Sequence, residues 1–429
     1  MRGNWNHSPR CDQRGYRTAR SHVGHNVDFR LWFLLLAIPL SAGEVAKQYR
    51  SDSNNDPKLP WFQPVHGEFP PEGLEHYVSG EYIGGDHIER EVIIRVDRND
   101  SQERALWDYP LAAKLLPYGS VYYLGQPAEL RDIPIGTHLH GWFYDRKEGE
   151  QRHWDSTRNG KPQNKYGHRA SPEVDFTQCL RVEDDFSYNV RRNQAWKVDG
   201  TDLEKMELYA TLQKDGKTEG KSKIFHLKSY TQVFQGKGFG ALESIKPGQT
   251  VQMNLTWVTL YGPGRVTQIW LDQEARELAS NLQLERHRNY VRQRGIPGWV
   301  DSVDDKNQHV LVTFFDGIDT SLFKDFDIIV PEPLGWPTSG GAKDDLKPKG
   351  TLAVATLARN MYDPVNDRKG GNILEVNQVP KKLGCSGTQI KVQCGMLLEG
   401  YRPGGMVRFF PAAWKVVALP REEGFFGKE

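Results

Sequence analysis

Two histidines and two aromatic residues alternate over a short stretch of the chain. They are His138, His140, Trp142 and Tyr144. In an extended strand, side chains two positions apart lie on the same face. Two imidazoles on one face are a usable pair of metal ligands, and neighbouring aromatic rings can stack on sugar rings. These four residues are therefore the candidate binding site.

A metal site at this position needs at least one more ligand. His153 or His168, in the polar segment that follows, could supply it. The alternative interpretation is a plain surface strip, covered by that segment or by the next domain. Because the sequence fixes no third ligand, we assign no metal ligand, no cofactor and no catalytic residue.

The strand that holds the two histidines follows a glycine bend, and the spacing of this bend recurs twice. The three copies are Leu130, Ile133, Gly136 and Leu139; Leu242, Ile245, Gly248 and Val251; and Leu398, Tyr401, Gly404 and Val407. After each glycine the residues alternate with a period of two, which predicts a strand with one buried and one solvated face. The copies predict a repeat of small β-barrel or β-sandwich units.

The first copy also carries a resemblance to known proteins. The segment from Gly125 to Gly136, with the pattern G-x-P-A-x-L-x-D-I-P-x-G, resembles a turn-and-strand motif of small periplasmic β-barrel domains in bacteria, most of them of unknown function. The stretches 257–266, 294–316 and 397–411 are similar in style to large uncharacterised secreted bacterial proteins. The resemblance implies a β fold and an exported location, and it transfers no functional residue.

The beginning of the chain has the pattern of a secretory signal peptide over residues 1–43. Scattered arginines precede an apolar run at 31–40, and small residues follow, so that cleavage is expected after Gly43. A short membrane anchor left uncut is the alternative. Residues 44–75 are rich in proline and predict a linker.

The rest of the chain predicts a mainly β fold. We expect three small OB-like β-barrel or sandwich units at 76–145, 176–272 and 296–420, with a polar insertion loop at 146–175. One connecting amphipathic helix is expected at 273–295, capped by Asp272 and ended by Gly295. Its predicted apolar face holds Ala275, Leu278, Ala279 and Leu282.

Composition narrows the function classes. The chain has 429 residues, with 56 basic and 55 acidic side chains and a net charge of +1. This balance argues against a nucleic-acid binder, although OB-type barrels can bind single strands. The hydrolase signatures G-x-S-x-G and H-E-x-x-H do not occur. The acidic pairs Asp184-Asp185, Asp304-Asp305 and Asp344-Asp345 are expected in turns that face water.

The cysteines are few, and they leave one question open. Cys385 and Cys394 could form a disulfide in an oxidising compartment, or they could be two free thiols. Cys179 would be unpaired in either case, and Cys11 lies in the expected signal peptide. No C-x-x-C pair occurs, so a zinc site made of cysteines is not expected.

Together these observations predict an exported, non-enzymatic binding or scaffold protein of the bacterial envelope or the extracellular space. Its partner would be a polysaccharide or another secreted protein, and it would be neither a nucleic-acid binder nor an integral membrane protein. The alternative is a metal-binding protein or a metal-dependent enzyme that uses His138 and His140.

Overall fold

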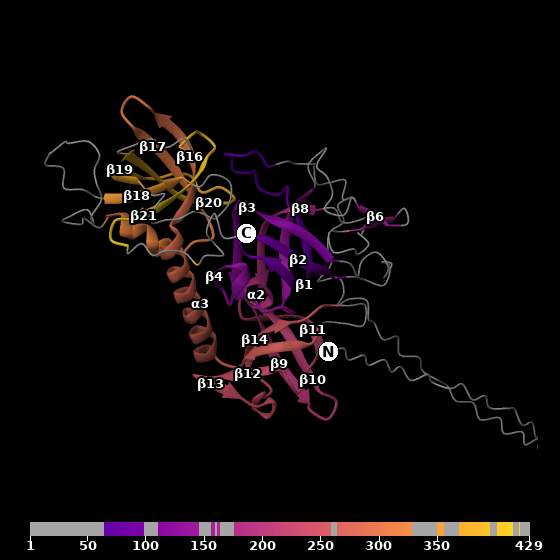
Figure 1. The fold of residues 1–429 in the computed structure, drawn as a ribbon. Helices are drawn as coiled ribbons and strands as arrows, with labels where there is room; N and C mark the ends of the chain where they lie inside the picture. The colour runs from indigo at the N-terminus through magenta and orange to yellow at the C-terminus, as the bar shows by residue number, and fades with distance from the viewer. Residues whose placement is uncertain are drawn as a thin grey trace, which may run out of the picture. The chain divides into compact units, whose positions relative to one another are not determined.

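The computed structural model describes residues 64–97, 110–145, 156–158, 161–163, 176–258, 264–327, 350–355, 369–394, 401–414 and 420. All of them belong to one compact unit, Ala42–Glu429. The expected signal peptide and most of the expected linker lie outside these residues. Within the described part, the protein is mainly β, with three β units and one long helix (Figure 1).

The first unit is a closed OB-type barrel. Its strands are β1 (His76–Asp86), β2 (Glu91–Val96), β3 (Pro110–Tyr123), β5 (His138–Asp145) and β8 (Phe176–Asp184). They pair in the ring β1-β2-β3-β8-β5-β1, in which β3 and β8 are parallel and all other pairs are antiparallel. The short β4 (Gln126–Ala128) pairs with the end of β3. This ring is the strand order of an OB fold.

One predicted boundary is wrong in this barrel. We expected β8 to begin the second unit, whereas it pairs with β3 and β5 and completes the first. The partner of a strand that returns after a long connection leaves no periodic signal in the sequence. The connection contains a small hairpin, β6 (Ser156–Arg158) and β7 (Lys161–Gln163), within the predicted insertion loop.

The second unit is an open sheet. Its order is β11-β10-β9-β14-β15-β12-β13. The strands are β9 (Gln194–Asp202), β10 (Glu207–Lys214), β11 (Lys217–His226), β12 (Gln232–Gln235), β13 (Gly238–Gly240), β14 (Thr250–Leu255) and β15 (Val266–Trp270). As in the first barrel, a single pair, β12 with β15, is parallel. A core around Trp196, Phe225 and Ile269 fills its concave face.

The third unit is a closed barrel in the order β16-β17-β20-β19-β18-β21. Its strands are β16 (Ile296–Asp304), β17 (His309–Phe315), β18 (Gly350–Ala355), β19 (Lys369–Gln378), β20 (Cys385–Cys394) and β21 (Met406–Pro411). In the first barrel one strand fills the gap between β3 and β5, and because those two run in opposite directions it must be parallel to one of them. Here two strands, β18 and β19, fill the corresponding gap, so every pair is antiparallel.

The glycine spacing found in the sequence marks the same turn in all three units. Gly136, Gly248 and Gly404 have φ values of +92°, +88° and +80°, which L-residues rarely adopt. The N–H of each glycine donates to a carbonyl of the first strand, that of Tyr82, Val198 or Val300. That same residue donates its own N–H to the carbonyl of the residue after the glycine. The short helices η2 (Leu130–Asp132) and η3 (Leu242–Ser244) precede the first two turns, while Leu398 lies outside the described residues.

The connecting helix is present as α3 (Gln273–Arg294). The Asp272 side chain accepts a hydrogen bond from the N–H of Ala275, and Gly295 ends the helix with φ +78°. Its buried face is more polar than the predicted stripe, because it includes Gln283 and His287 besides Ala275 and Val291, whereas Leu282 is 56% exposed. The helix therefore makes many of its contacts through hydrogen bonds, such as that of Ser280 with the carbonyl of Leu124.

Cys385 and Cys394 are both free and buried. They are the first and last residues of the single strand β20. Nine steps of about 3.3 Å place their Cα atoms roughly 30 Å apart, whereas a disulfide needs about 7 Å or less. The proposed bridge is therefore wrong, and the alternative of two unpaired thiols holds.

Two further expectations concern the linker and membrane-spanning helices. The end of the predicted linker packs against the protein, since Phe69 and Leu74 contact the aromatic cluster around Trp299. None of the helices that the structure describes has both the length and the apolar character needed to cross a membrane.

Candidate functional site

His138 and His140 lie at the start of β5, directly after the Gly136 turn. Leu139 and Phe143, which alternate with them, point into the barrel core. The two histidines therefore point out of the barrel, as the alternation predicts, but they are not solvated. His138 is 0% exposed and His140 is 1% exposed. They are covered by α2 (Asp185–Val190), which follows β8, and by the segment that contains β14.

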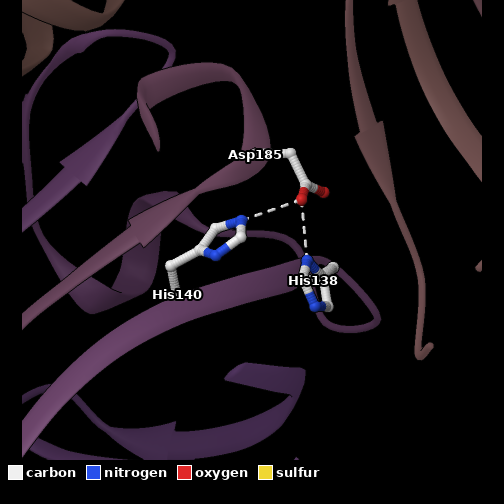
Figure 2. A group of neighbouring side chains, drawn as sticks. All are labelled: His138, His140 and Asp185. Atoms are coloured by element: carbon white, nitrogen blue, oxygen red, sulfur yellow. Dashed lines mark hydrogen bonds and ion pairs between the residues drawn. The ribbon is translucent and has the colours of Figure 1, made fainter. Parts of the chain in front are cut away.

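The two rings meet on one carboxylate, as Figure 2 shows. His138 Nδ1 lies 2.7 Å and His140 Nε2 lies 3.0 Å from Oδ1 of Asp185. His138 Nε2 lies 2.8 Å from Oδ2 of Asp97, and His140 Nδ1 lies 2.6 Å from the hydroxyl of Tyr77. Every ring nitrogen of both histidines therefore has a partner.

The two carboxylates are fixed from the second sheet as well as from the first barrel. Asp185 Oδ2 accepts the N–H of Leu255 at 2.8 Å, and Asp97 Oδ1 accepts the N–H of Val258 at 3.1 Å. Asp97 also accepts the hydroxyl of Ser79 at 2.7 Å. The site thus lies at the junction of the first barrel and the second sheet.

The neighbouring Asp184 caps α2 by accepting the N–H of Ser187. It also accepts the side-chain amide of Asn254 at 2.9 Å, and the amide oxygen of Asn254 accepts the N–H of Phe186. Asp184 and Asp185 are 0% and 2% exposed. The expectation that this acidic pair faces water is therefore wrong, because the pair is the hydrogen-bonded seam between two units.

The two histidines carry different charges. Burial alone would lower the pKa of His138, but the charges of Asp185 and Asp97 outweigh it and raise the pKa to about 10. Burial, with the nearby charge of His138, lowers the pKa of His140 to about 4 in spite of its hydrogen bond to Asp185. Burial also opposes the charge of Asp185, yet the cation at His138 holds its pKa below the ordinary range. Burial raises the pKa of Asp97, although the charge of His138 opposes this. At neutral pH, an imidazolium at His138 therefore lies between Asp185 and Asp97, beside the neutral imidazole of His140.

The same geometry contains a candidate metal centre. His138 Nδ1, His140 Nε2 and one oxygen of Asp185 lie within 4.8 Å of one another. Asp97 and Tyr77 hold the other nitrogen of each ring, which is the arrangement that outer partners of metal-bound histidines have. A divalent ion bound there would displace the proton on His138 Nδ1, and the proton of His140 would have to lie on Nδ1, toward Tyr77, so that Nε2 is free. The present contacts of 2.7 and 3.0 Å are hydrogen-bond distances.

The other predicted site residues separate in the structure. Tyr144 is 1% exposed and packs among Tyr118, Trp299 and Phe315, away from the two histidines. Trp142 is partly exposed. His153 and His168, proposed as third ligands, lie outside the described residues. Asp185 takes that place, and the only sequence signal for it was its position directly after an apolar strand.

Trp142 belongs to a surface that we call the aromatic–arginine surface. It consists of Tyr77, Trp142, Arg181, Tyr188, Arg191 and Arg192. Trp142 and Tyr188 are stacked, with ring centroids 6.5 Å apart and an interplanar angle of 18°. The guanidinium of Arg192 lies 3.6 Å from the centroid of Tyr188, and that of Arg181 lies 4.5 Å from Trp142. Beneath them, the buried Glu183 pairs with Arg191 and Arg192 at 3.3 and 3.0 Å.

Comparisons with known proteins add no name to this site. No family model, no curated protein and no solved structure matches the chain. The resemblance of the first glycine turn to periplasmic barrel domains therefore stays a prediction.

Proposed function

We propose that the protein is an exported, non-enzymatic binding protein of the bacterial envelope or extracellular space, and that its ligand is an acidic polysaccharide. The observation that carries this proposal is the aromatic–arginine surface. It combines partly exposed rings with partly exposed cations on one barrel. The proposed export rests on the pattern of residues 1–43, and the proposed descent of the three units from one repeat rests on their shared glycine turn.

The charges of this surface favour an anionic ligand. Three arginines stand against one carboxylate, that of Glu183, which is 1% exposed and already holds two of them. The side chains of Arg191 and Arg192 are 32% and 33% exposed. Stacking on aromatic rings keeps their planar guanidinium groups oriented, and such groups bind carboxylates or sulfates through two parallel hydrogen bonds.

The aromatic rings of this surface would bind the sugar part of the ligand. The apolar face of a sugar ring can stack on Trp142, whereas the Tyr188 ring is already stacked on His140 at 3.7 Å and lies 3.6 Å from the guanidinium of Arg192. By contrast, the histidines and carboxylates that could do chemistry are buried and hydrogen-bonded to one another. A binding role therefore accounts for the exposed residues better than a catalytic role does.

The test is a binding measurement with two polymers. Wild-type protein should bind a polyuronate and not a neutral glucan, in affinity electrophoresis or calorimetry. Trp142→Ala should weaken polyuronate binding by about tenfold, since a lost stacking contact is worth about 1–2 kcal/mol. Trp257→Ala is the matched control, because Trp257 also lies under an arginine, Arg95, at 4.0 Å. Equal losses in both variants, or binding of neither polymer, would refute the proposal.

A metal-binding function is the second candidate, and the convergence of His138, His140 and Asp185 is the observation that favours it. Elemental analysis of the purified protein tests it, with the double variant His138→Ala/His140→Ala alongside. A stoichiometric transition metal that the double variant lacks would establish the centre. Protein without metal that still melts as a folded chain would leave the proton-linked network described above.

A further inference from the structure

Arg191 and Arg192 pair with different oxygens of the same carboxylate, that of Glu183. Nε of Arg191 lies 3.3 Å from Oε2, and Nη1 of Arg192 lies 3.0 Å from Oε1. Nη1 of Arg192 also donates to the carbonyl of Tyr188 at 2.9 Å. Within the described part of the chain, the Nε and Nη2 groups of Arg192 donate to no acceptor, so they are available to a ligand.

Each of the two guanidinium groups also lies on an aromatic ring of its own. That of Arg191 is 4.2 Å from the ring centroid of Tyr122, a residue outside the aromatic–arginine surface. That of Arg192 is 3.6 Å from the centroid of Tyr188 and 5.5 Å from that of Trp142. Because such contacts hold a planar cation in place, the two neighbouring arginines are fixed beside different rings.

The strand register shows how these rings are distributed over the barrel. Trp142 of β5 pairs with Arg181 of β8, and Tyr122 of β3 pairs with Glu183 of β8. The strands β3 and β5 therefore flank β8, and two strand spacings of about 4.8 Å separate them by about 10 Å. A single sugar unit is shorter than this span, so a ligand that reaches both strands has more than one unit.

The charges around the two arginines favour more than one anionic group. Arg181 is a third cation nearby: burial is the main cause of its lowered pKa, and the charges of Arg191 and Arg192 lower it further. Two carboxylates oppose these cations. One is the buried carboxylate that Arg191 and Arg192 share, and the other is that of Asp316, whose charge adds to the effect of burial in raising the pKa of Tyr122. The cations outnumber the carboxylates, and they repel one another.

We propose that the ligand is a chain of acidic sugars bound along its length, with one negative group at Arg192 and a second at Arg191. This inference rests on the proposed function and adds to it the number of sugar units that the surface binds. The first unit stacks on Trp142 beside Arg192. The chain then crosses β8 toward β3, where Tyr122 positions Arg191 for the second negative group. A single acidic sugar would use only Trp142 and Arg192.

Titration calorimetry of the full chain with galacturonate and with its linear tetramer tests this proposal. The tetramer should bind about thirtyfold more tightly or better, because the second contact becomes intramolecular. That ratio exceeds the gain expected from four equivalent units alone. Equal affinities for monomer and tetramer, with polyuronate still bound, would overturn this inference and leave the proposed function intact. Binding of neither the tetramer nor the polymer would overturn both.

Arg191→Gln separates the two contacts. It should weaken tetramer binding by about tenfold, since a hydrogen-bonded ion pair is lost, and leave galacturonate binding unchanged. The fold should persist because Glu183 keeps its bond to Arg192. Arg95→Gln is the matched control, because Arg95 also pairs with a glutamate, Glu81, and lies over an aromatic ring. An equal loss for monomer and tetramer in Arg191→Gln would contradict the assignment of Arg191 to a second unit.

Two substitutions of Tyr122 test its role as a positioning residue. Tyr122→Leu removes the ring beneath Arg191 and should weaken tetramer binding by about two- to fivefold, with galacturonate binding unchanged. Tyr122→Phe keeps the ring and should restore the affinity of the wild type. If the phenylalanine variant binds the tetramer as weakly as the leucine variant does, the ring does not position Arg191.

Discussion

At the scale of single residues, the unusual feature is a buried cation between two buried aspartates. Asp97 follows β2, Asp185 begins α2, and His138 begins β5, so three distant stretches meet in one group. Removing one member of such a buried set is far more costly than the set is worth, because the remaining charges stay buried without compensation. Substituting each histidine should therefore lower the free energy of unfolding more at the charged His138 than at the neutral His140.

His138→Gln should lower the free energy of unfolding by about 3–5 kcal/mol, because Asp97 and Asp185 are left without the cation. His140→Gln should cost about 1–3 kcal/mol, since only hydrogen bonds of a neutral ring are lost. His226→Gln, on the exposed end of β11, should stay within about 0.5 kcal/mol. Urea denaturation of the three variants measures the differences. Equal costs at His138 and His140 would contradict the assigned charges.

The raised pKa of His138 also predicts a pH dependence. The folded protein holds a proton with a pKa of about 10, against an ordinary value of 6.5. The unfolded chain releases this proton at lower pH, so the stabilisation is complete below pH 6.5 and is lost as the pH rises to about 10. The stability gap between wild type and His138→Gln should narrow over that interval. A constant gap would show that His138 is neutral when folded.

At the scale of the elements, the glycine turns set where three strands begin. Gly248 is the cleanest position for a test, because a Cβ there would meet no atom within 4 Å and only the φ of +88° is unfavourable. Gly248→Ala should therefore cost about 1–2 kcal/mol. Gly238→Ala has equally open space and no positive φ, and it should change stability by less than about 0.5 kcal/mol. Thermal melts of both variants compare backbone strain directly.

These turns explain why much of the fold could be predicted. Their signal is local: a glycine at a fixed offset, followed by alternation of residues such as Leu139 and Phe143 with their polar neighbours. The ends of α3 could be predicted from equally local signals, because Asp272 and Gly295 are capping residues. The buried face of α3 could not be predicted in this way. His287 is buried, and its ring accepts the main-chain N–H of Asp319. No pattern within the helix indicates this contact.

At the scale of the whole molecule, the first barrel and the second sheet share one polar seam. Asp185→Asn should therefore speed hydrogen exchange in both β5 and β14, since Asp185 bonds His138, His140 and the N–H of Leu255. Asp301→Asn is the control. Its carboxylate accepts the hydroxyl of Thr313 within the third barrel, so faster exchange should stay in that barrel. If β14 is unaffected in Asp185→Asn, the two units open independently.

Only part of the candidate site could be predicted from the sequence, because its members come from distant stretches of the chain. Spacing placed His138 and His140 on one face, and the structure agrees. Their partners Asp97 and Asp185 are 41 and 47 residues away from His138, and a single sequence contains no mark of such pairings. The face that holds the two histidines is buried because the neighbouring unit covers it. The residue pattern of a single strand does not indicate such a contact.

The parallel pairing of β3 with β8 has a consequence for synthesis. A ribosome makes β1, β2, β3 and β5 in sequence, but the ring stays open between β3 and β5 until Phe176–Asp184 has emerged. The next residue is Asp185, the partner of both histidines. Closure of the first barrel and assembly of its charged seam thus wait for the same short stretch of nascent chain. Before that moment, the edges of β3 and β5 are exposed to other chains, and a chaperone would be needed most there.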